Sequence, residues 1–321
     1  MKSACMIVPT GVGASIGGFA GDASRVARKL SEKLQLIVNP NVVNAACFSG
    51  ITPNMLYVEG FSINEFFQSK TALIPSKNNK IGIIFDKKIP QDVLNIHINT
   101  INAVKTVYDI NIQAIEITKK NVEVSFAIQN SGISSGEIKN PDTLIDAAEN
   151  LINKGCNAIA VVCLFPEAED DDYENGNGVD IVGGVEAIIS HLLSKTFQIP
   201  VAHAPAFADY SITSKLVNAK AAAEYITPTF LPCILLGLQN APMIEPLEQA
   251  SRPQTIRAEQ LSGLIMPYNS LGCIPAIEAQ RLKIPVFAIK ENKTVLNVTA
   301  KNLGINAIEL DSYEDLIKIL D

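Results

Sequence analysis

The residues best suited to ligand binding form a glycine-rich segment, PTGVGASIGGFAGD, at residues 9–22. It follows a short apolar run and precedes a helical pattern. Closely spaced glycines let a backbone approach a ligand and direct its N–H groups at it, and the next helix adds the positive end of its dipole. We therefore expect an anion to bind here, at Gly11, Gly13, Ser15, Gly17 and Gly18. The alternative is a turn whose glycines serve only tight packing.

The spacing of these glycines disfavours NAD and ATP as ligands. The dinucleotide fingerprint G-x-G-x-x-G requires glycine where this chain has Ile16, and the next predicted strand leads to Asn39 instead of an acidic residue. A P-loop requires lysine after its last glycine, but Phe19 follows Gly18.

Polar side chains follow other apolar runs. In open parallel sheets ligands bind beyond the carboxyl ends of the strands, where amides and hydroxyls can donate and accept hydrogen bonds. After the run LQLIV the candidates are Asn39, Asn41 and Asn44. In the segment 129–142 they are Ser131, Ser134 and Ser135. Local turns explain the asparagines equally well, and for the serines we favour a turn with helix caps.

The segment 167–177, EAEDDDYENGN, is the most charged part of the chain. Its carboxylate oxygens suit Mg²⁺ or Mn²⁺, with Asp170, Asp171 and Asp172 as candidate ligands. A solvated loop is the alternative that we favour. Asp180 precedes a predicted helix and is a candidate both for capping that helix and for catalysis.

Two residues at the ends of apolar runs could act in catalysis. His203 ends the run IPVAH and could be a general acid or base, although a lone histidine is more often a packing residue. Lys290 ends the run IPVFAIK and could hold a phosphate or carboxylate as a point charge. Polar residues near the ends of adjacent runs complete the ligand-binding candidates: Asn269, Ser270 and Asn292.

Short apolar runs alternate with amphipathic segments along the whole chain, for example residues 23–34, 90–108 and 141–154. Apolar runs typify strands covered on both faces, and their alternation with helices predicts βαβ units. We therefore expect a doubly wound α/β fold with a mostly parallel sheet. Two Rossmann-like lobes, residues 1–166 and 167–321, would hold the site between them, with elements exchanged across that division. VEVSFAI is expected either as a further strand of this α/β pattern or as a hairpin partner of IQAIEI, because only residues 118–121 separate the two runs.

Composition excludes several classes of protein. The net charge is −7 and there is no basic run, so nucleic acid and anionic membranes are poor partners. The six cysteines form no C-x-x-C pair, and most lie in apolar runs, which indicates reduced thiols in a reducing compartment. No apolar stretch reaches the roughly 18 residues of a membrane-spanning helix, and the apolar run at the N-terminus is too short for a signal peptide.

Several segments together resemble a conserved family of cyanobacterial and chloroplast proteins of unknown function. They are PTGVGASIGGFAGDA, NPNVVN, LYVEG, KNPDTL, GVDIVGGVEAIISH, IPVAHAPAF, TFLPC and AIKENKT, and the resemblance runs from residue 1 to the end. It implies a cyanobacterial cytosol or a plastid stroma, and it implies no mechanism.

Two functions remain open. The first is an enzyme that acts on a small anionic metabolite, bearing phosphate or carboxylate, at the carboxyl ends of the strands. The second is a non-catalytic metabolite- or nucleotide-binding regulatory protein. A histidine and a carboxylate converging beside the glycine-rich segment would favour the enzyme, and a pocket of backbone N–H groups and amides alone would favour the regulator. A homo-oligomer is left open.

Overall fold

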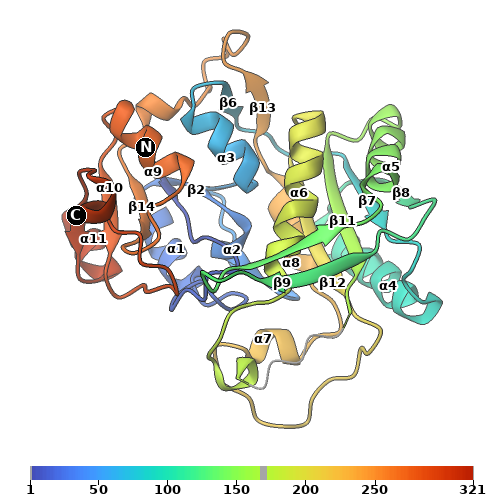
Figure 1. Cartoon of the computed structure of the whole chain (residues 1–321). Helices are drawn as coiled ribbons and strands as arrows, with labels where there is room; N and C mark the ends of the chain where they lie inside the picture. Colours follow the sequence, from blue (N-terminus) through green and yellow to red (C-terminus); the bar gives the residue numbers. More distant parts are fainter. Residues whose placement is uncertain (1, 167–171, 321) are drawn as a thin grey trace.

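Two parallel sheets organise the protein (Figure 1), of which a computed structural model describes residues 2–166 and 172–320. The larger sheet has six strands in the order β16-β15-β14-β1-β2-β5, and the smaller has four in the order β12-β11-β7-β8. Every pairing within both sheets is parallel. The expected α/β fold with mostly parallel sheets is therefore confirmed. In the larger sheet the strands are β1 (Ser3–Met6), β2 (Gln35–Val38), β5 (Met55–Tyr57), β14 (Leu264–Pro267), β15 (Val286–Ile289) and β16 (Ile308–Leu310). In the smaller they are β7 (Ile81–Phe85), β8 (Ile112–Ile117), β11 (Ala158–Leu164) and β12 (Val201–Ala206).

The helices lie close to the amphipathic segments of the sequence, because a helix that covers a sheet must turn an apolar stripe toward it. The segment 90–108, for example, contains a helix at Gln91–Tyr108. None of the helices in residues 2–166 and 172–320 is long and apolar enough to cross a membrane. They are α1 (Ser24–Ser31), α2 (Pro40–Val43), α3 (Gly60–Phe67), α4 (Gln91–Tyr108), α5 (Pro141–Asn153), α6 (Gly183–Phe197), α7 (Ala222–Tyr225), α8 (Leu231–Gln239), α9 (Ile274–Arg281), α10 (Ala300–Leu303) and α11 (Tyr313–Leu320), with 3-10 turns at Tyr173–Asn175 and Ala258–Gln260.

Three short antiparallel pairs flank the sheets, and one of them corrects the expected hairpin. IQAIEI forms β8, which pairs in parallel with β7, whereas β9 (Val124–Ile128) pairs with β10 (Ser134–Ile138). The hairpin alternative was wrong because α4 carries the chain from β7 back to a parallel neighbour, which leaves β9 to pair with the strand that follows it. The other two pairs are β3 (Asn44–Ala45) with β4 (Phe48–Ser49), and β6 (Thr71–Ile74) with β13 (Met243–Pro246).

Helix α8 lies between the two sheets (Figure 1) and joins them in one core. Its sequence LPCILLGLQ is apolar on nearly every face, as a helix buried on all sides requires. One large core cluster contains Leu36 of the six-stranded sheet, Ile83 of the four-stranded sheet and Leu235 of α8. Gly237 allows close packing, because a Cβ there would lie 2.8 Å from the ring of Tyr57.

The two sheets do not follow the expected division at residue 166. The six-stranded sheet takes three strands from residues 3–57 and three from residues 264–310. The four-stranded sheet uses β11 and β12, which lie on opposite sides of residue 166. Strands are thus exchanged across the division, and the chain returns to its first sheet after completing its second.

Candidate functional site

A cavity of about 350 Å³ lies where both sheets meet the beginnings of α6 and α8. From the six-stranded sheet it receives the segments that follow β1 and β2, and from the four-stranded sheet it receives β12. The sequence candidates among its lining residues are Gly18, Asn41, Asn44, Asp180 and His203. The cavity therefore brings together candidates from four of the segments that were expected to carry a site.

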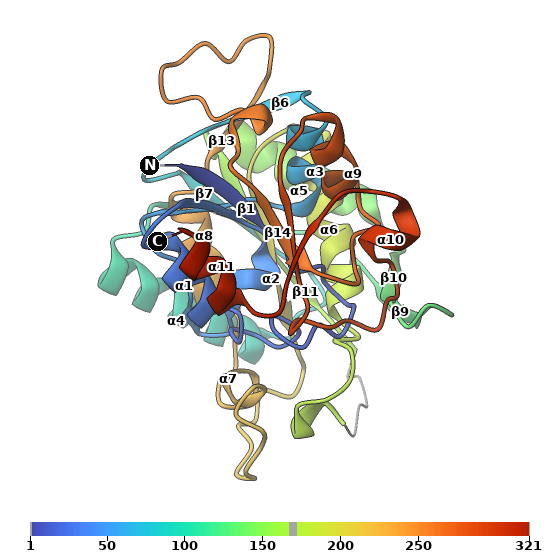
Figure 2. The same ribbon diagram turned by 90° about the vertical axis from the view of Figure 1, so that its left-hand side faces the viewer.

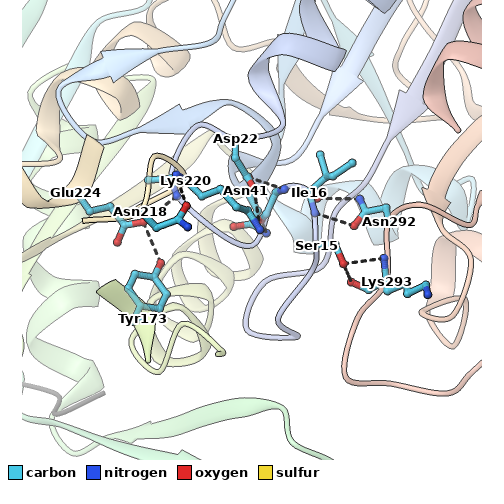
Figure 3. Close-up of polar contacts among 12 residues, drawn as sticks. Ser15, Ile16, Asp22, Asn41, Tyr173, Asn218, Lys220, Glu224, Asn292 and Lys293 are labelled. Carbon is cyan, nitrogen blue, oxygen red and sulfur yellow. Dashed lines mark hydrogen bonds and ion pairs between the residues drawn. The ribbon is translucent and has the colours of Figure 1, made fainter. Parts of the chain in front are cut away.

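The glycine-rich segment is held in place by the protein's own side chains (Figure 3). The N–H of Gly17 donates to Asp22 Oδ1 at 2.5 Å, and the N–H of Ile16 donates to Asn292 Oδ1 at 3.0 Å. The N–H of Ala20 donates to Glu224 Oε1 at 2.8 Å. These N–H groups were expected to face an anion, and internal carboxylate and amide oxygens already accept from them.

The glycines of this segment also satisfy packing. Gly17 has φ +90°, and a Cβ at this position would lie 2.8 Å from Val8 Cγ1. A Cβ at Gly18 would lie 2.1 Å from the carbonyl oxygen of Ala14. Gly18 lines the cavity, whereas Gly11 packs on Ser134 and Gly13 on Val179 and Val295. The need for glycine at Gly17 is thus explained by backbone conformation and close contact.

Three carboxyl groups line the cavity: half-buried Asp180 and buried Glu186 at the start of α6, and half-buried Glu224 in α7. Asp180 Oδ1 accepts from the N–H groups of Val182 and Gly183, each at 3.0 Å, at the start of α6. Glu224 Oε1 accepts from Ala20 N–H and, at 2.9 Å, from the hydroxyl of Tyr173 (Figure 3). Glu186, on the first turn of α6, is only 8% exposed, and its Oε1 has no hydrogen-bond partner.

Burial makes all three carboxyl groups hard to ionise. Loss of hydration raises the pKa of Glu186 well above its usual range, and the charges of Asp180 and Glu224 raise it further. Burial and the charge of Asp180 raise the pKa of Glu224 to about 8, against the hydrogen bonds from Ala20 and Tyr173. Burial also raises the pKa of Asp180, opposed by its two backbone donors. Near pH 7 the cavity therefore holds carboxylic acid protons.

His203 is neutral at this site. Burial lowers the pKa of its imidazole to about 3, with a further contribution from His191. Its Nδ1 lies 2.9 Å from Ser190 Oγ, and that hydroxyl donates to the carbonyl of Ala187 at 3.2 Å. Ser190 therefore accepts from Nδ1–H, which leaves Nε2 as the nitrogen with a free lone pair.

The expectation that the strand ends at His203 was wrong. Strand β12 continues to Ala206. His203 lies in the middle of this strand, where it pairs with Val161 of β11. Pro205 does not stop the strand because β12 is at the edge of its sheet, where a missing N–H is tolerated.

The other asparagine candidates hold loops together. Asn39 is 6% exposed and clamps Val8, donating to its carbonyl at 2.8 Å and accepting from its N–H at 3.0 Å. Asn41 Nδ2 donates to the carbonyl of Gly17 at 2.6 Å and so fixes the glycine-rich segment beside the cavity. Asn44 Oδ1 accepts from the hydroxyl of Tyr57 at 3.2 Å.

The remaining candidates do not appear among the described lining residues. Ser134 Oγ accepts from Gly184 N–H at 3.0 Å, Ser135 lies in β10, and Ser131 is exposed.

The candidates near β14 and β15 make local contacts. Asn269 donates to the carbonyls of Thr294 and Leu296, and Ser270 donates to that of Pro267. Buried Asn292 bonds to Ile16 and to the hydroxyl of Tyr313. Ser15 Oγ donates to the carbonyl of Lys293 at 3.1 Å (Figure 3). Lys290 Nζ pairs on the surface with Glu309 at 3.4 Å and Asp311 at 3.5 Å.

The expected metal ligands gain no support from the described part of the chain. Asp170 and Asp171 lie outside the described residues, and Asp172 precedes the turn at Tyr173–Asn175. Within residues 2–166 and 172–320 no group of three or more His, Cys, Asp or Glu side chains could hold a metal ion.

Sequence reasoning missed Glu186, Glu224 and Tyr173 as site residues. A signal existed for Glu186, because it is the single charge in the apolar segment GGVEAIIS. Glu224 and Tyr173 gave no such signal, because their burial depends on loops from distant parts of the chain meeting each other.

Comparisons with known proteins agree with the expected resemblance. A family model described as "Protein of unknown function (DUF3326)" matches residues 3–321. An uncharacterized lipoprotein of Synechococcus sp. is 35% identical over 317 residues, which cover 97% of this chain and 88% of that protein. No solved structure matches the chain. The resemblance to a cyanobacterial family of unknown function over nearly the whole chain is therefore confirmed.

Proposed function

This chain belongs to the family described as protein of unknown function DUF3326, and we propose from its cavity that it is an enzyme transferring protons to and from a small molecule. One observation carries the proposal: a neutral imidazole and three carboxyl groups, of which Glu186 is buried, line the same cavity. Buried titratable groups with displaced pKa values in a cleft are typical of catalytic sites.

The carboxyl groups divide naturally into an acid and a base. Glu186 keeps its proton near neutral pH and is the general acid. Asp180 accepts two backbone hydrogen bonds, which favour its ionised form, so it is the better proton acceptor. Neighbouring carboxyl groups in unequal environments take opposite roles in this way.

His203 orients the substrate in this scheme. A pKa of about 3 makes its imidazole a weak base, but Nε2 can accept a hydrogen bond from a substrate hydroxyl or amine. Ser190 fixes the ring through Nδ1. His203 thus contacts the substrate while the carboxyl groups exchange protons with it.

The buried acid favours the enzyme over the regulatory alternative. An unpartnered carboxyl group such as Glu186 lowers stability, because its polar atoms lose water and gain no hydrogen bond. A binding pocket that only recognises a metabolite does not need such a group, whereas proton transfer does. The lining also contains no lysine or arginine among its described residues, so its charge does not favour the anion expected from the glycine content.

The test is conversion or isotope labelling of small molecules in D₂O. The full chain, incubated with a defined metabolite mixture, is expected to convert at least one component or to place deuterium in it, as mass spectrometry would show. Glu186→Gln is expected to slow this by about 100-fold or more. The matched control Glu248→Gln, at an exposed site, keeps the rate. A metabolite that binds and is neither converted nor labelled would contradict the proposal and support the regulatory alternative.

We propose a reducing compartment, the cyanobacterial cytosol or plastid stroma, as the setting. All six cysteines are free thiols, which suits such a compartment. The Synechococcus relative is called a lipoprotein. Cell fractionation followed by detection of the full chain tests the proposal, and recovery with the membranes would contradict it.

A further inference from the structure

The catalytic cavity continues into a second cavity of about 410 Å³, which we call the vestibule. The two share six lining residues: Tyr173, Phe207, Asp209, Glu224, Tyr225 and Phe230. The vestibule lies against the excursion that carries α7, which projects from one end of the molecule (Figures 1 and 2). A ligand that reaches Glu186 and His203 can therefore extend into it.

Aromatic side chains gather in the vestibule although they make up only 6% of the chain. It is lined by Tyr173, Phe207, Tyr210, Tyr225 and Phe230. Phe207 and Phe230 meet edge to face, with ring centroids 6.4 Å apart. The faces of such rings are electron-rich and attract cations.

Asp209 gives the vestibule a negative charge, whereas Glu224 holds its proton near pH 7. Asp209 and Glu224 are its acidic residues, and no lysine or arginine is among the described lining residues of either cavity. Hydrogen bonds from Ser211 lower the pKa of Asp209, which therefore stays ionised. An ionised carboxylate beside electron-rich rings suits a cationic ligand.

Next to the vestibule, the protein's own Lys220 already binds an aromatic ring and a carboxylate. Lys220 Nζ lies 4.8 Å from the ring centroid of Phe19 and 3.9 Å from Asp22 Oδ2. The ring of Phe19 packs in turn on Tyr173, with centroids 4.5 Å apart. An ammonium group is thus already held beside an aromatic face and a carboxylate at this border. Figure 3 shows Lys220 and Asp22 of this group.

We infer that the substrate carries an alkylammonium group, which binds in the vestibule against the aromatic rings and the carboxylate of Asp209. The rest of the substrate extends toward Glu186 and His203. This inference rests on the proposed function, since it names the class of molecule on which that site acts.

The probe is choline, compared with its neutral isostere 3,3-dimethylbutan-1-ol. In calorimetric or NMR titrations of the full chain, choline is expected to bind at least about tenfold more tightly, because the two differ only in the charge that the rings and the Asp209 carboxylate recognise. Asp209→Asn and Tyr210→Leu, both at exposed positions, are expected to weaken choline binding several-fold. The control Tyr108→Leu, on an exposed part of α4, keeps it.

The outcomes separate this inference from the proposed function. Equal affinity for the two probes, or choline binding unaffected by both vestibule variants, would overturn the inference. If deuterium enters only neutral or anionic metabolites and choline does not bind, the proposed function stands and the inference fails. If choline binds through these residues and no metabolite is converted or labelled, the ammonium site stands and the enzyme proposal fails.

Discussion

At the scale of single residues, Glu186 has an environment that lowers the stability of the fold when its side chain ionises. Its carboxyl group is buried, lacks a partner at Oε1, and shares the cavity with other carboxyl groups. A raised pKa in the folded state means that the folded chain holds a proton which the unfolded chain releases above about pH 4.3. Stability therefore falls as pH rises toward the folded pKa.

Glu186→Gln is expected to remove this pH dependence at one position. The amide never ionises, so at pH 8 the variant should be more stable than the native chain by about 1–3 kcal/mol. At pH 4, where the native carboxyl group is protonated in both states, the two should differ little. Urea unfolding from pH 4 to pH 9 checks this. If the free energies of unfolding of the two proteins change with pH in parallel, Glu186 ionises freely in the folded chain.

At the scale of elements, one side-chain pair links α3, which follows a strand of the six-stranded sheet, to α6, which precedes a strand of the four-stranded sheet. Glu59 begins α3, where its Oε2 accepts from the N–H of Phe61 at 2.8 Å, and its Oε1 lies 2.8 Å from His191 Nε2 on α6. Burial lowers the pKa of His191, but the hydrogen bond and charge of Glu59 outweigh it, so the pKa is raised above 6.5.

This pair is expected to stabilise the fold on the acidic side of neutrality. A histidine with a raised folded pKa contributes fully below its unfolded value of about 6.5, and the contribution is lost as pH rises through the folded value. Because the His191 side chain is 44% exposed, water screens the pair and its worth is about 0.5–1 kcal/mol. His191→Gln should lose stability at pH 5.5 and little at pH 8.5, measured by urea unfolding. Lys195→Gln, on the same helix, should show no such difference, and a pH-independent loss in His191→Gln would contradict the ion pair.

At the scale of the whole molecule, the sequence predicts elements better than it predicts their partners. Apolar runs become strands because both faces of each sheet are covered, and Gln91–Tyr108 matches its expected range to one residue. Pairing is different, since an apolar run does not encode which neighbour it will join. A hairpin of VEVSFAI with IQAIEI was therefore left open, and the return of β14 to β1 was not foreseen.

The same distinction applies to the site. Asn41, Asp180 and His203 were chosen because ligands gather at the carboxyl ends of parallel strands, and all three line the cavity, although His203 lies within β12. Asn292 and Lys290 also follow a strand. However, Asn292 hydrogen-bonds to the glycine-rich segment, and Lys290 pairs with surface carboxylates. Strand position alone does not separate these roles, because it says nothing of which side chains a distant loop will cover. Glu224 was missed for that reason.

The shared core predicts how the molecule unfolds. Leu235 of α8 is fully buried in the cluster that contains strands of both sheets. Truncating it leaves a cavity between them, so Leu235→Ala should lower stability by about 2–5 kcal/mol. Because α8 packs on both sheets, the variant should still unfold in one cooperative transition, with equal calorimetric and van't Hoff enthalpies. Hydrogen exchange should then show amides of β1 and β11 opening with the same reduced free energy. The exposed helix position Val107→Ala on α4 is the matched control and should change little. Two separated transitions, with only one sheet weakened, would mean that the sheets are independent units, and α8 would then belong to just one of them.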